Sequence, residues 1–396
     1  MVADPQRQPK GDFRRDRLTW IAYALLAWFA YLQAAPGLVI GHLRHQLHLS
    51  YSVGGLHVAA FAAGSLLAGV SSARLESALG RRALFWSAAA AMGAGAIGLT
   101  AGRIAPVTVG SLLVMGVGGG LLLATIQAAL ADHHGEHRAV ALAEANVAAS
   151  IAYVVLIGVL SLTAAVHAGW RVALLGSLVV PALAWLSNRR VAIDASPPLR
   201  ATDSRLPGVF WIAAAMLFCT TAAEWCITAW GATFVEGAAD VSTDTAVTLM
   251  AGYFGGVVAG RTLGSRLARR HEPAGLLASA LAVTAAGFAI LWPATGPAQA
   301  LIGLWVIGTG LGNLFPMGLS VTVGLAPGGA VLASGRAVAM TSFAVLLAPL
   351  EVGTLADATS LTAALGVVPI LLAFAAAGLA LVRRPRTRAA LHRPLR

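Results

Sequence analysis

The chain has 396 residues, of which 58% are hydrophobic and 11% are charged, and its mean hydropathy is +0.78. These values lie outside the range of soluble globular proteins, so they exclude a soluble domain and predict a membrane protein. The net charge of +11 would suggest nucleic-acid binding in a soluble protein. In a membrane chain, the distribution of the basic residues has to be considered first.

Apolar stretches long enough to cross a bilayer recur along almost the whole chain. A hydrocarbon core about 30 Å thick requires roughly 20 apolar residues per helix. Twelve such stretches are expected, at 18–41, 52–73, 82–102, 106–131, 138–163, 170–188, 208–235, 242–264, 273–292, 297–325, 330–356 and 361–382. The sequence therefore predicts an all-α membrane protein with twelve transmembrane helices.

Polar segments flank these stretches. Residues 1–17 precede the first apolar run without a small-residue cleavage site, which predicts a retained tail and not a secretory signal. Residues 383–396 form a second, basic tail. The longest polar stretch inside the chain, 189–207, contains prolines and is expected to be a linker.

Positive charge lies almost entirely on one side of the predicted spans. All but three of the 27 Lys and Arg residues fall on the side of the two termini, the exceptions being Arg44, Arg103 and Arg171. Because cytoplasmic loops carry the excess of Lys and Arg, we expect both termini in the cytoplasm and the chain in the cell (inner) membrane. The basic excess then reflects topology, and no nucleic-acid partner is expected.

The two halves of the sequence resemble each other. The tripeptide WIA at 20–22 recurs at 211–213, an offset of 191, and the second spans align at an offset of 192. After a longer loop, RAVAL from Arg138 matches RAVAM from Arg336 at an offset of 198. Such parallel repeats are typical of transporters built from two related bundles. We therefore predict two pseudo-symmetric six-helix bundles, at 18–188 and 208–382, joined by a cytoplasmic linker.

Local patterns resemble those of the major facilitator superfamily. The family's signature after the second helix ends in Gly-Arg-Arg, and ARLESALGRR at 73–82 keeps Gly80, Arg81 and Arg82 but has Ser77 at the usual Asp position. A second copy, GRTLGSRLARR at 260–270, keeps the Gly and Arg frame without the acid. The resemblance covers nearly the whole chain. It implies a monomeric secondary transporter that moves a small molecule by alternating access.

Glu224 is an acid in the middle of the apolar run 220–235. A charge at mid-membrane costs at least about 2.5 to 3.5 kcal/mol, so this side chain is expected to face the bundle interior. At the offset of 191 it aligns with Gln33, and the resemblance implies that the two face each other across a central cavity. Apolar neighbours such as Trp225 favour the protonated carboxyl, as a proton-coupling group requires. A hydrogen bond that only holds helices together is the alternative.

Other residues are candidates for contact with the cargo. The stretch 308–318 contains several glycines, Asn313 and Pro316 inside one span, and such discontinuities mark binding sites or gates. Asn313 is therefore a candidate cargo contact, with glycine packing as the alternative. The aromatic residues Tyr31, Trp225 and Phe315 are candidates for the cavity wall, although each could equally pack against a neighbouring helix.

A cytoplasmic gate is expected near Glu144, about six residues into the fifth span. Glu144 would pair with the basic segment 261–270 across the two halves, in an ion pair that forms and breaks as the halves rock. A static ion pair on the surface is an equally supported alternative. The predicted gate residues are Glu144, Gly80, Arg81, Arg82, Arg261 and Arg266.

The histidine clusters at 42–48 and 133–137 match no established metal spacing, so we expect solvated loops and no metal. His42 and His45 could instead tune a pH response near the outer mouth. No catalytic or phosphate-binding motif occurs, and the glycine-rich stretches lie within apolar spans, so neither an enzyme nor a cofactor is expected. An intramembrane enzyme or a non-transporting sensor remains the remote alternative.

The sequence thus predicts a proton-coupled secondary transporter. The scarcity of Arg and Lys within the spans argues against multiply anionic cargo, which needs basic clamps. An apolar cavity with one acid favours a small amphipathic molecule, neutral or weakly cationic, and would suit export of drug-like compounds. Uptake of a small polar solute, such as a sugar or a nucleoside, is the alternative.

Overall fold

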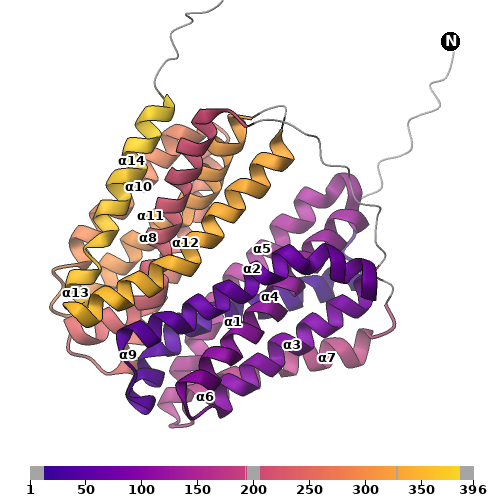
Figure 1. The fold of residues 1–396 in the computed structure, drawn as a ribbon, viewed down its shortest axis with the longest axis horizontal. Helices are drawn as coiled ribbons and strands as arrows, with labels where there is room; N and C mark the ends of the chain where they lie inside the picture. The colour runs from indigo at the N-terminus through magenta and orange to yellow at the C-terminus, as the bar shows by residue number, and fades with distance from the viewer. Residues whose placement is uncertain (1–12, 192, 194–205, 327–328, 384–396) are drawn as a thin grey trace, which may run out of the picture.

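The computed structural model describes residues 13–191, 193, 206–326 and 329–383, and the regular structure in these residues is entirely helical. The helices form two groups that lie side by side (Figure 1). The N-terminal group comprises α1 (Arg17–Leu47), α2 (Tyr51–Leu79), α3 (Arg81–Ala101), α4 (Ala105–His134), the 3₁₀ turn η1 (Gly135–His137), α5 (Arg138–Ala165), α6 (Trp170–Gly176) and α7 (Val179–Asn188). The C-terminal group comprises α8 (Gly208–Ala238), α9 (Thr243–Leu267), α10 (Pro273–Leu291), α11 (Pro297–Gly324), α12 (Ala330–Ala358), α13 (Leu361–Ala364) and α14 (Val367–Arg383).

Each of the twelve expected spans coincides with helix, and the all-α membrane fold is confirmed. Ten stretches of the described chain are long and apolar enough to cross a membrane, with α4 and α5 counted as one stretch and α9 not among them. The more polar α9 carries Asp244, Arg261 and Arg266. Most of the expected tails and linker, namely 1–12, 192, 194–205 and 384–396, lies outside the described residues.

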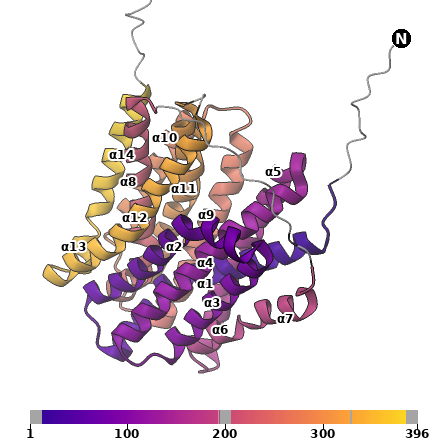
Figure 2. The same cartoon turned by 45° about the vertical axis from the view of Figure 1, so that its right-hand side comes forward.

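The sixth and twelfth spans each consist of two helices, where a single helix was expected. The break between α6 and α7 lies four residues before Pro181, and the break between α13 and α14 lies four residues before Pro369. A proline has no N–H to donate to the carbonyl four residues earlier, and its ring clashes with that carbonyl. The missing N–H and the ring clash weaken the helix at both sites, and the chain breaks there, although α1, α11 and α12 each continue through a proline. Both views place α7 at the outer edge of the N-terminal group (Figure 2).

Glycines set the helix packing in the same way in both groups. A Cβ on Gly116 of α4 would overlap the carbonyl of Phe61 on α2. A Cβ on Gly308 of α11 would likewise overlap the carbonyl of Tyr253 on α9. Both glycines and both partners are related by the offset of 192. Small residues let membrane helices approach closely, so the repeat in the sequence corresponds to a repeated packing contact.

The helices are connected at two opposite ends of the molecule. Successive spans run in opposite directions, so α1 begins and α14 ends at the same end, called here the tail side. At the other end, the far side, α1 is followed by α2 and α8 by α9. The two groups contact each other mainly through α1 with α8, α2 with α12 and α5 with α9.

Candidate functional site

Helices α1 and α8 cross near their midpoints, and this crossing positions the candidate site. A Cβ on Gly37 of α1 would overlap the carbonyl oxygen of Thr228 on α8, so the two backbones are in direct contact there. Gly37 and Thr228 are related by the offset of 191, as are Gln33 and Glu224 one turn nearer the tail side. Positions equivalent in the two halves therefore meet at the crossing.

Gln33 and Glu224 line one small cavity of about 50 Å³ beside this crossing. The hydroxyl of Tyr153 on α5 donates to Gln33 Oε1 at 3.2 Å. The hydroxyls of Thr228 and Tyr253 are hydrogen-bonded to each other at 2.8 Å. Within the described part of the chain, the carboxylate of Glu224 has neither a hydrogen bond nor an ion pair. The structure thus places an unpaired acid beside an amide and hydroxyl groups.

Arg261 of α9 lines the same small cavity. It does not form an ion pair with Glu224. Its Nη1 instead donates to Ser150 Oγ of α5 at 3.2 Å, a bond between the two groups of helices. Arg261 was expected at the cytoplasmic gate. In the structure it lies deeper in the molecule, where it lines the small cavity shared by Gln33 and Glu224. The site therefore contains a cation as well as an acid.

A larger cavity of about 530 Å³ lies on the other side of the crossing, between α1, α2, α4, α8 and α12. Gln33 and Trp225 belong to the walls of both cavities. The rest of the wall is mostly apolar and includes Phe29 and Phe61, with Gln127 as a further amide. Together, the two cavities form an apolar volume with the polar groups of the small cavity at one edge.

Three of the expected cavity residues lie elsewhere. Asn313 donates from Nδ2 to the carbonyl of Gly260 at 2.7 Å and so holds α11 against α9, within the C-terminal group. Tyr31 is buried, and its hydroxyl donates to the carbonyl of Ala173 at 2.9 Å within the N-terminal group. Phe315 lines neither cavity. None of the three lines either cavity in this conformation, and their predicted contact with the cargo stays a prediction.

Arg81 forms a charge cluster on the tail side. Its guanidinium pairs with Glu76 at 2.7 Å and with Asp132 at 2.6 Å, and its side chain is nearly buried. Glu76, one residue before the family's usual Asp position, thus partners the signature arginine. Gly80 takes a positive φ of 78° between α2 and α3, a conformation that favours glycine. Arg82 donates to the carbonyl of Arg189.

Glu144 does not pair with the segment 261–270 in this conformation. Its carboxylate instead accepts hydrogen bonds from Arg15 at 2.8 and 2.5 Å, and a third from the hydroxyl of Tyr23 at 3.1 Å. Both donors belong to the N-terminal group. Arg266 is exposed in the last turn of α9. The expected gate pair across the halves is therefore replaced by a pair inside one half.

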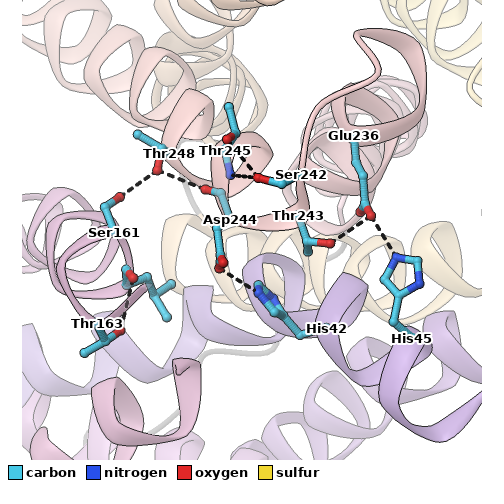
Figure 3. A network of polar contacts seen from close by, with 11 residues as sticks. His42, His45, Ser161, Thr163, Glu236, Ser242, Thr243, Asp244, Thr245 and Thr248 are labelled. Carbon is cyan, nitrogen blue, oxygen red and sulfur yellow. Dashed lines mark hydrogen bonds and ion pairs between the residues drawn. The ribbon is translucent and has the colours of Figure 1, made fainter. Parts of the chain in front are cut away.

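Contacts between the halves concentrate on the far side. His42 Nε2 lies 2.9 Å from Asp244 Oδ1, and His45 Nε2 lies 2.7 Å from Glu236 Oε1 (Figure 3). The hydroxyl of Thr243 donates to the same oxygen of Glu236 at 2.8 Å. These bonds join the end of α1 to the end of α8 and the start of α9. A solvated loop was expected from the sequence for the histidine cluster at 42–48. The structure instead places this cluster in the interface between the halves.

Two further contacts close the far side. The amides of Tyr51 and Ser52, at the start of α2, each donate to the carboxylate of Asp357 on α12 at 2.7 Å. A carboxylate is favourable there because a helix N-terminus carries free N–H groups and a positive dipole end. The hydroxyls of Ser161 on α5 and Thr248 on α9 are 2.8 Å apart (Figure 3).

The second histidine cluster joins α1 to α4. His133 Nε2 lies 2.7 Å from Asp16 Oδ2, and His134 Nε2 lies 2.8 Å from the hydroxyl of Thr19. Asp16 also caps α1, because its Oδ1 accepts from the amide of Thr19 at 3.0 Å. These bonds hold the start of α1 against the end of α4.

Three residues of the small cavity were not predicted from the sequence, namely Tyr153, Thr228 and Tyr253. One signal was available, because Tyr253 aligns with Phe61 at the offset of 192, and the two line the two central cavities. Thr228 aligns with Gly37 in the same way. A comparison of every aligned pair around Glu224 would have found both residues.

Comparisons with known proteins agree with this architecture. The family model of the Major Facilitator Superfamily matches residues 19–331. No protein with a curated description matches the chain. Among solved structures, a D-xylose-proton symporter has 15% identity and a TM-score of 0.77, covering 93% of this chain and 97% of its own. A bacterial homologue of the human lysosomal transporter Spinster, inward-facing and occupied, has 13% identity and a TM-score of 0.74, covering 94% and 98%.

The nucleoside transporter NupG is a third match, with 14% identity, a TM-score of 0.68 and coverage of 93% of this chain and 98% of its own. At these identities the likeness concerns the fold alone. The family model, in contrast, covers most of the chain, and the two related groups of helices agree with it. The chain therefore belongs to the Major Facilitator Superfamily and is a multi-pass membrane transporter, not an enzyme.

Proposed function

We propose that the protein is a proton-coupled transporter in which Glu224 carries the proton. The observation that supports this most is the small cavity shared by Gln33 and Glu224, where the carboxylate at mid-membrane has neither a hydrogen bond nor an ion pair among the described residues. Burial in an apolar surrounding favours the protonated form of a carboxylate, the nearby Arg261 favours the charged form, and access to water lets the proton exchange between the two. Such a group can load a proton in one conformation and lose it in the other.

The proposed orientation places the tail side in the cytoplasm of the cell membrane. All but three of the Lys and Arg residues belong to that side, as the positive-inside rule requires. With this orientation, the far-side contacts close the outer mouth, and the structure corresponds to an inward-facing state. The predicted gate at Glu144 and the arginines would then form when the tail side closes.

The proposed cargo is a small amphipathic molecule. The larger cavity offers an apolar volume of about 530 Å³, and Gln33 and Trp225 connect it to the acid in the smaller one. Arg261 beside the acid disfavours a cation when Glu224 is protonated. A neutral cargo therefore fits better than a weakly cationic one.

Uptake of a small polar solute is the second candidate. Gln33, Tyr153 and Thr228 provide amide and hydroxyl groups that could hydrogen-bond a sugar or a nucleoside. Solved structures of similar fold include a D-xylose-proton symporter and a nucleoside transporter. This candidate shares the proposed role of Glu224 and differs only in the cargo.

Proton coupling can be tested in proteoliposomes that contain the pH-sensitive dye pyranine. A panel of pentoses, nucleosides and neutral amphipathic drugs is added on the more acidic side, and both cargo and proton entry are recorded. In the wild type, proton entry should accompany entry of the cargo. Glu224→Gln should lose accumulation driven by the pH gradient but retain exchange of labelled for unlabelled cargo, because the site still binds.

The matched control is Glu351→Gln. Glu351 lies in a span but lines a separate pocket between α8, α12 and α14, so its loss should leave coupling intact. If Glu224→Gln accumulates a confirmed cargo as the wild type does, Glu224 is not the coupling group. The compound that enters decides between the two cargo classes.

A further inference from the structure

The far-side interface contains a second polar pair with the same symmetry as the pair in the central cavity. His45 and Glu236 are related by the offset of 191, as Gln33 and Glu224 are. Each lies twelve residues farther along its helix, which is about 18 Å at a rise of 1.5 Å per residue. The His45 pair is therefore a separate site at the far end of the same two helices.

Glu236 is largely enclosed, whereas His45 reaches the solution. The side chain of Glu236 is 18% exposed and that of His45 is 65% exposed. Oε1 of Glu236 accepts from Thr243 and contacts His45, but its Oε2 is buried without a hydrogen-bond partner among the described residues. A buried carboxylate in this condition is stabilised by a positive partner. Protonated His45 provides that charge, and its exposure lets it exchange protons with the outer solution.

His42 differs from His45 in one decisive way. It contacts Asp244, but its other ring nitrogen, Nδ1, is buried without a hydrogen-bond partner in the described structure. A second proton on this ring would create a buried N–H with no acceptor, which is costly. His42 therefore lacks the partner that a second ring proton would need, and it provides a natural control for His45.

The other charged groups at this end do not replace His45. Arg44 has its guanidinium 3.4 Å from the ring centroid of Tyr51, and Asp357 is engaged at the start of α2. His48 caps α1 through its backbone, and Asp240 occupies the turn after α8. Neither His48 nor Asp240 forms a hydrogen bond or ion pair with Glu236 or His45 in the described structure. The remaining far-side groups on neighbouring elements are His57, which is buried against Thr108, and Arg103, His167, Arg171 and Glu351.

We propose that His45 and Glu236 form a second proton-binding site, distinct from Glu224, which holds the far side closed when His45 is protonated. Imidazole changes its charge between about pH 5 and pH 8, and a charge-assisted hydrogen bond to a carboxylate is stronger than a neutral one. Only the closed far side makes this bond, so a falling pH that protonates His45 shifts the population toward the closed far side. Opening the far side separates the pair and breaks the bond.

The site gives external acidity a direct effect on the transport cycle. With the tail side in the cytoplasm, an acidic exterior would close the outer mouth and favour the inward-facing state. This inference requires only that the far side opens and closes, as in alternating access. It does not depend on Glu224 being the coupling group.

The opening of the far side can be measured directly as the distance between two spin labels, by double electron–electron resonance. Spin labels are placed at Leu162 of α5 and Gly237 of α8, both exposed, in a Cys219→Ala/Cys226→Ala background in lipid nanodiscs. From about pH 8 to about pH 5.5, the ratio of short to long distances should rise about twofold to fivefold, as expected for a half-exposed ion pair. His45→Gln keeps an N–H donor but cannot titrate, so its ratio should not change with pH.

Three further variants decide the outcome. Glu236→Gln should also abolish the pH dependence, whereas His42→Gln and Glu224→Gln should retain it. A wild-type ratio that is independent of pH, or a pH dependence that persists in both His45→Gln and Glu236→Gln, overturns the proposal. If Glu224→Gln alone removes the dependence, the sensor is Glu224; the proposed function then stands while this inference fails.

Discussion

Gly37 shows how a single residue without a side chain sets the geometry of the candidate site. The backbones of α1 and α8 touch at Gly37 and Thr228, and this contact keeps Gln33 and Glu224 at one cavity. Gly37→Ala would push the helices apart and cost about 1 to 3 kcal/mol of stability, the usual range for overpacking. We expect a lower unfolding temperature of the detergent-solubilised protein, measured by tryptophan fluorescence, together with reduced transport.

Gly69→Ala is the matched control, because a Cβ at Gly69 of α2 would meet no atom within 4 Å. It should melt at or above the temperature of the wild type, since alanine favours helix more than glycine does. Equal melting temperatures for the Gly37 and Gly69 variants would contradict the close crossing of α1 and α8.

At the residue scale, the sequence predicted a position when two independent signals agreed. Glu224 combined the cost of a buried charge with a repeat partner in Gln33, and both line the small cavity. Asn313 rested only on the glycines and the proline around it, and Tyr31 only on its residue type. Every face of a helix in a membrane bundle can be apolar, so the sequence does not reveal which face a polar side chain occupies. Both of these residues bond to backbone carbonyls within their own half.

At the scale of the element, Asp16 fixes the start of α1. Its carboxylate accepts from the amide and the hydroxyl of Thr19 and contacts His133. Partial burial alone would raise the pKa of Asp16, but the hydrogen bonds from Thr19 and the nearby His133 outweigh it and lower the pKa. Loss of an N-cap costs about 0.5 to 2 kcal/mol, so Asp16→Ala should lower the unfolding temperature at neutral pH.

The sign of the pH dependence follows from the lowered pKa of Asp16. The stabilisation is fully present above the ordinary aspartate pKa of about 3.9 and is lost as the pH falls through the lower value in the folded protein. Asp16→Asn keeps the cap but cannot titrate, so it should melt near the wild type at neutral pH and lose less stability in acid. Identical acid losses in the two proteins would assign the effect to other carboxylates.

Helix positions were predictable, whereas helix interruptions were not. Each of the twelve expected spans is helical because apolar stretches of about 20 residues have no other stable form in a bilayer. Pro181 and Pro369 lie inside such stretches, and hydropathy does not register the missing N–H. The same Val-Val-Pro sequence opens α7 and α14, but proline alone would not have predicted the breaks, because α1, α11 and α12 each continue through a proline.

At the scale of the whole molecule, the sequence predicted the two related halves but not their relative tilt. The repeat is visible in the sequence as aligned residues such as Gly116 and Gly308. The conformation depends on which end holds the halves together, and that balance comes from a few polar contacts whose partners are far apart in the sequence. Glu144 illustrates this, because its carboxylate pairs with Arg15, which is 129 residues away in the sequence.

The far-side contact between Ser161 and Thr248 allows the rocking of the halves to be tested. Their hydroxyls are 2.8 Å apart, on α5 and α9 respectively, so cysteines at both positions should form a disulfide on mild oxidation. The cross-link joins the two halves at the end that must open. Transport in proteoliposomes should therefore stop almost completely on oxidation and return on reduction. Each single cysteine variant should be insensitive to the same treatment, which also controls for the native Cys219 and Cys226. If the cross-linked protein still transports, the far side does not open during the cycle, and access from that end must follow another route.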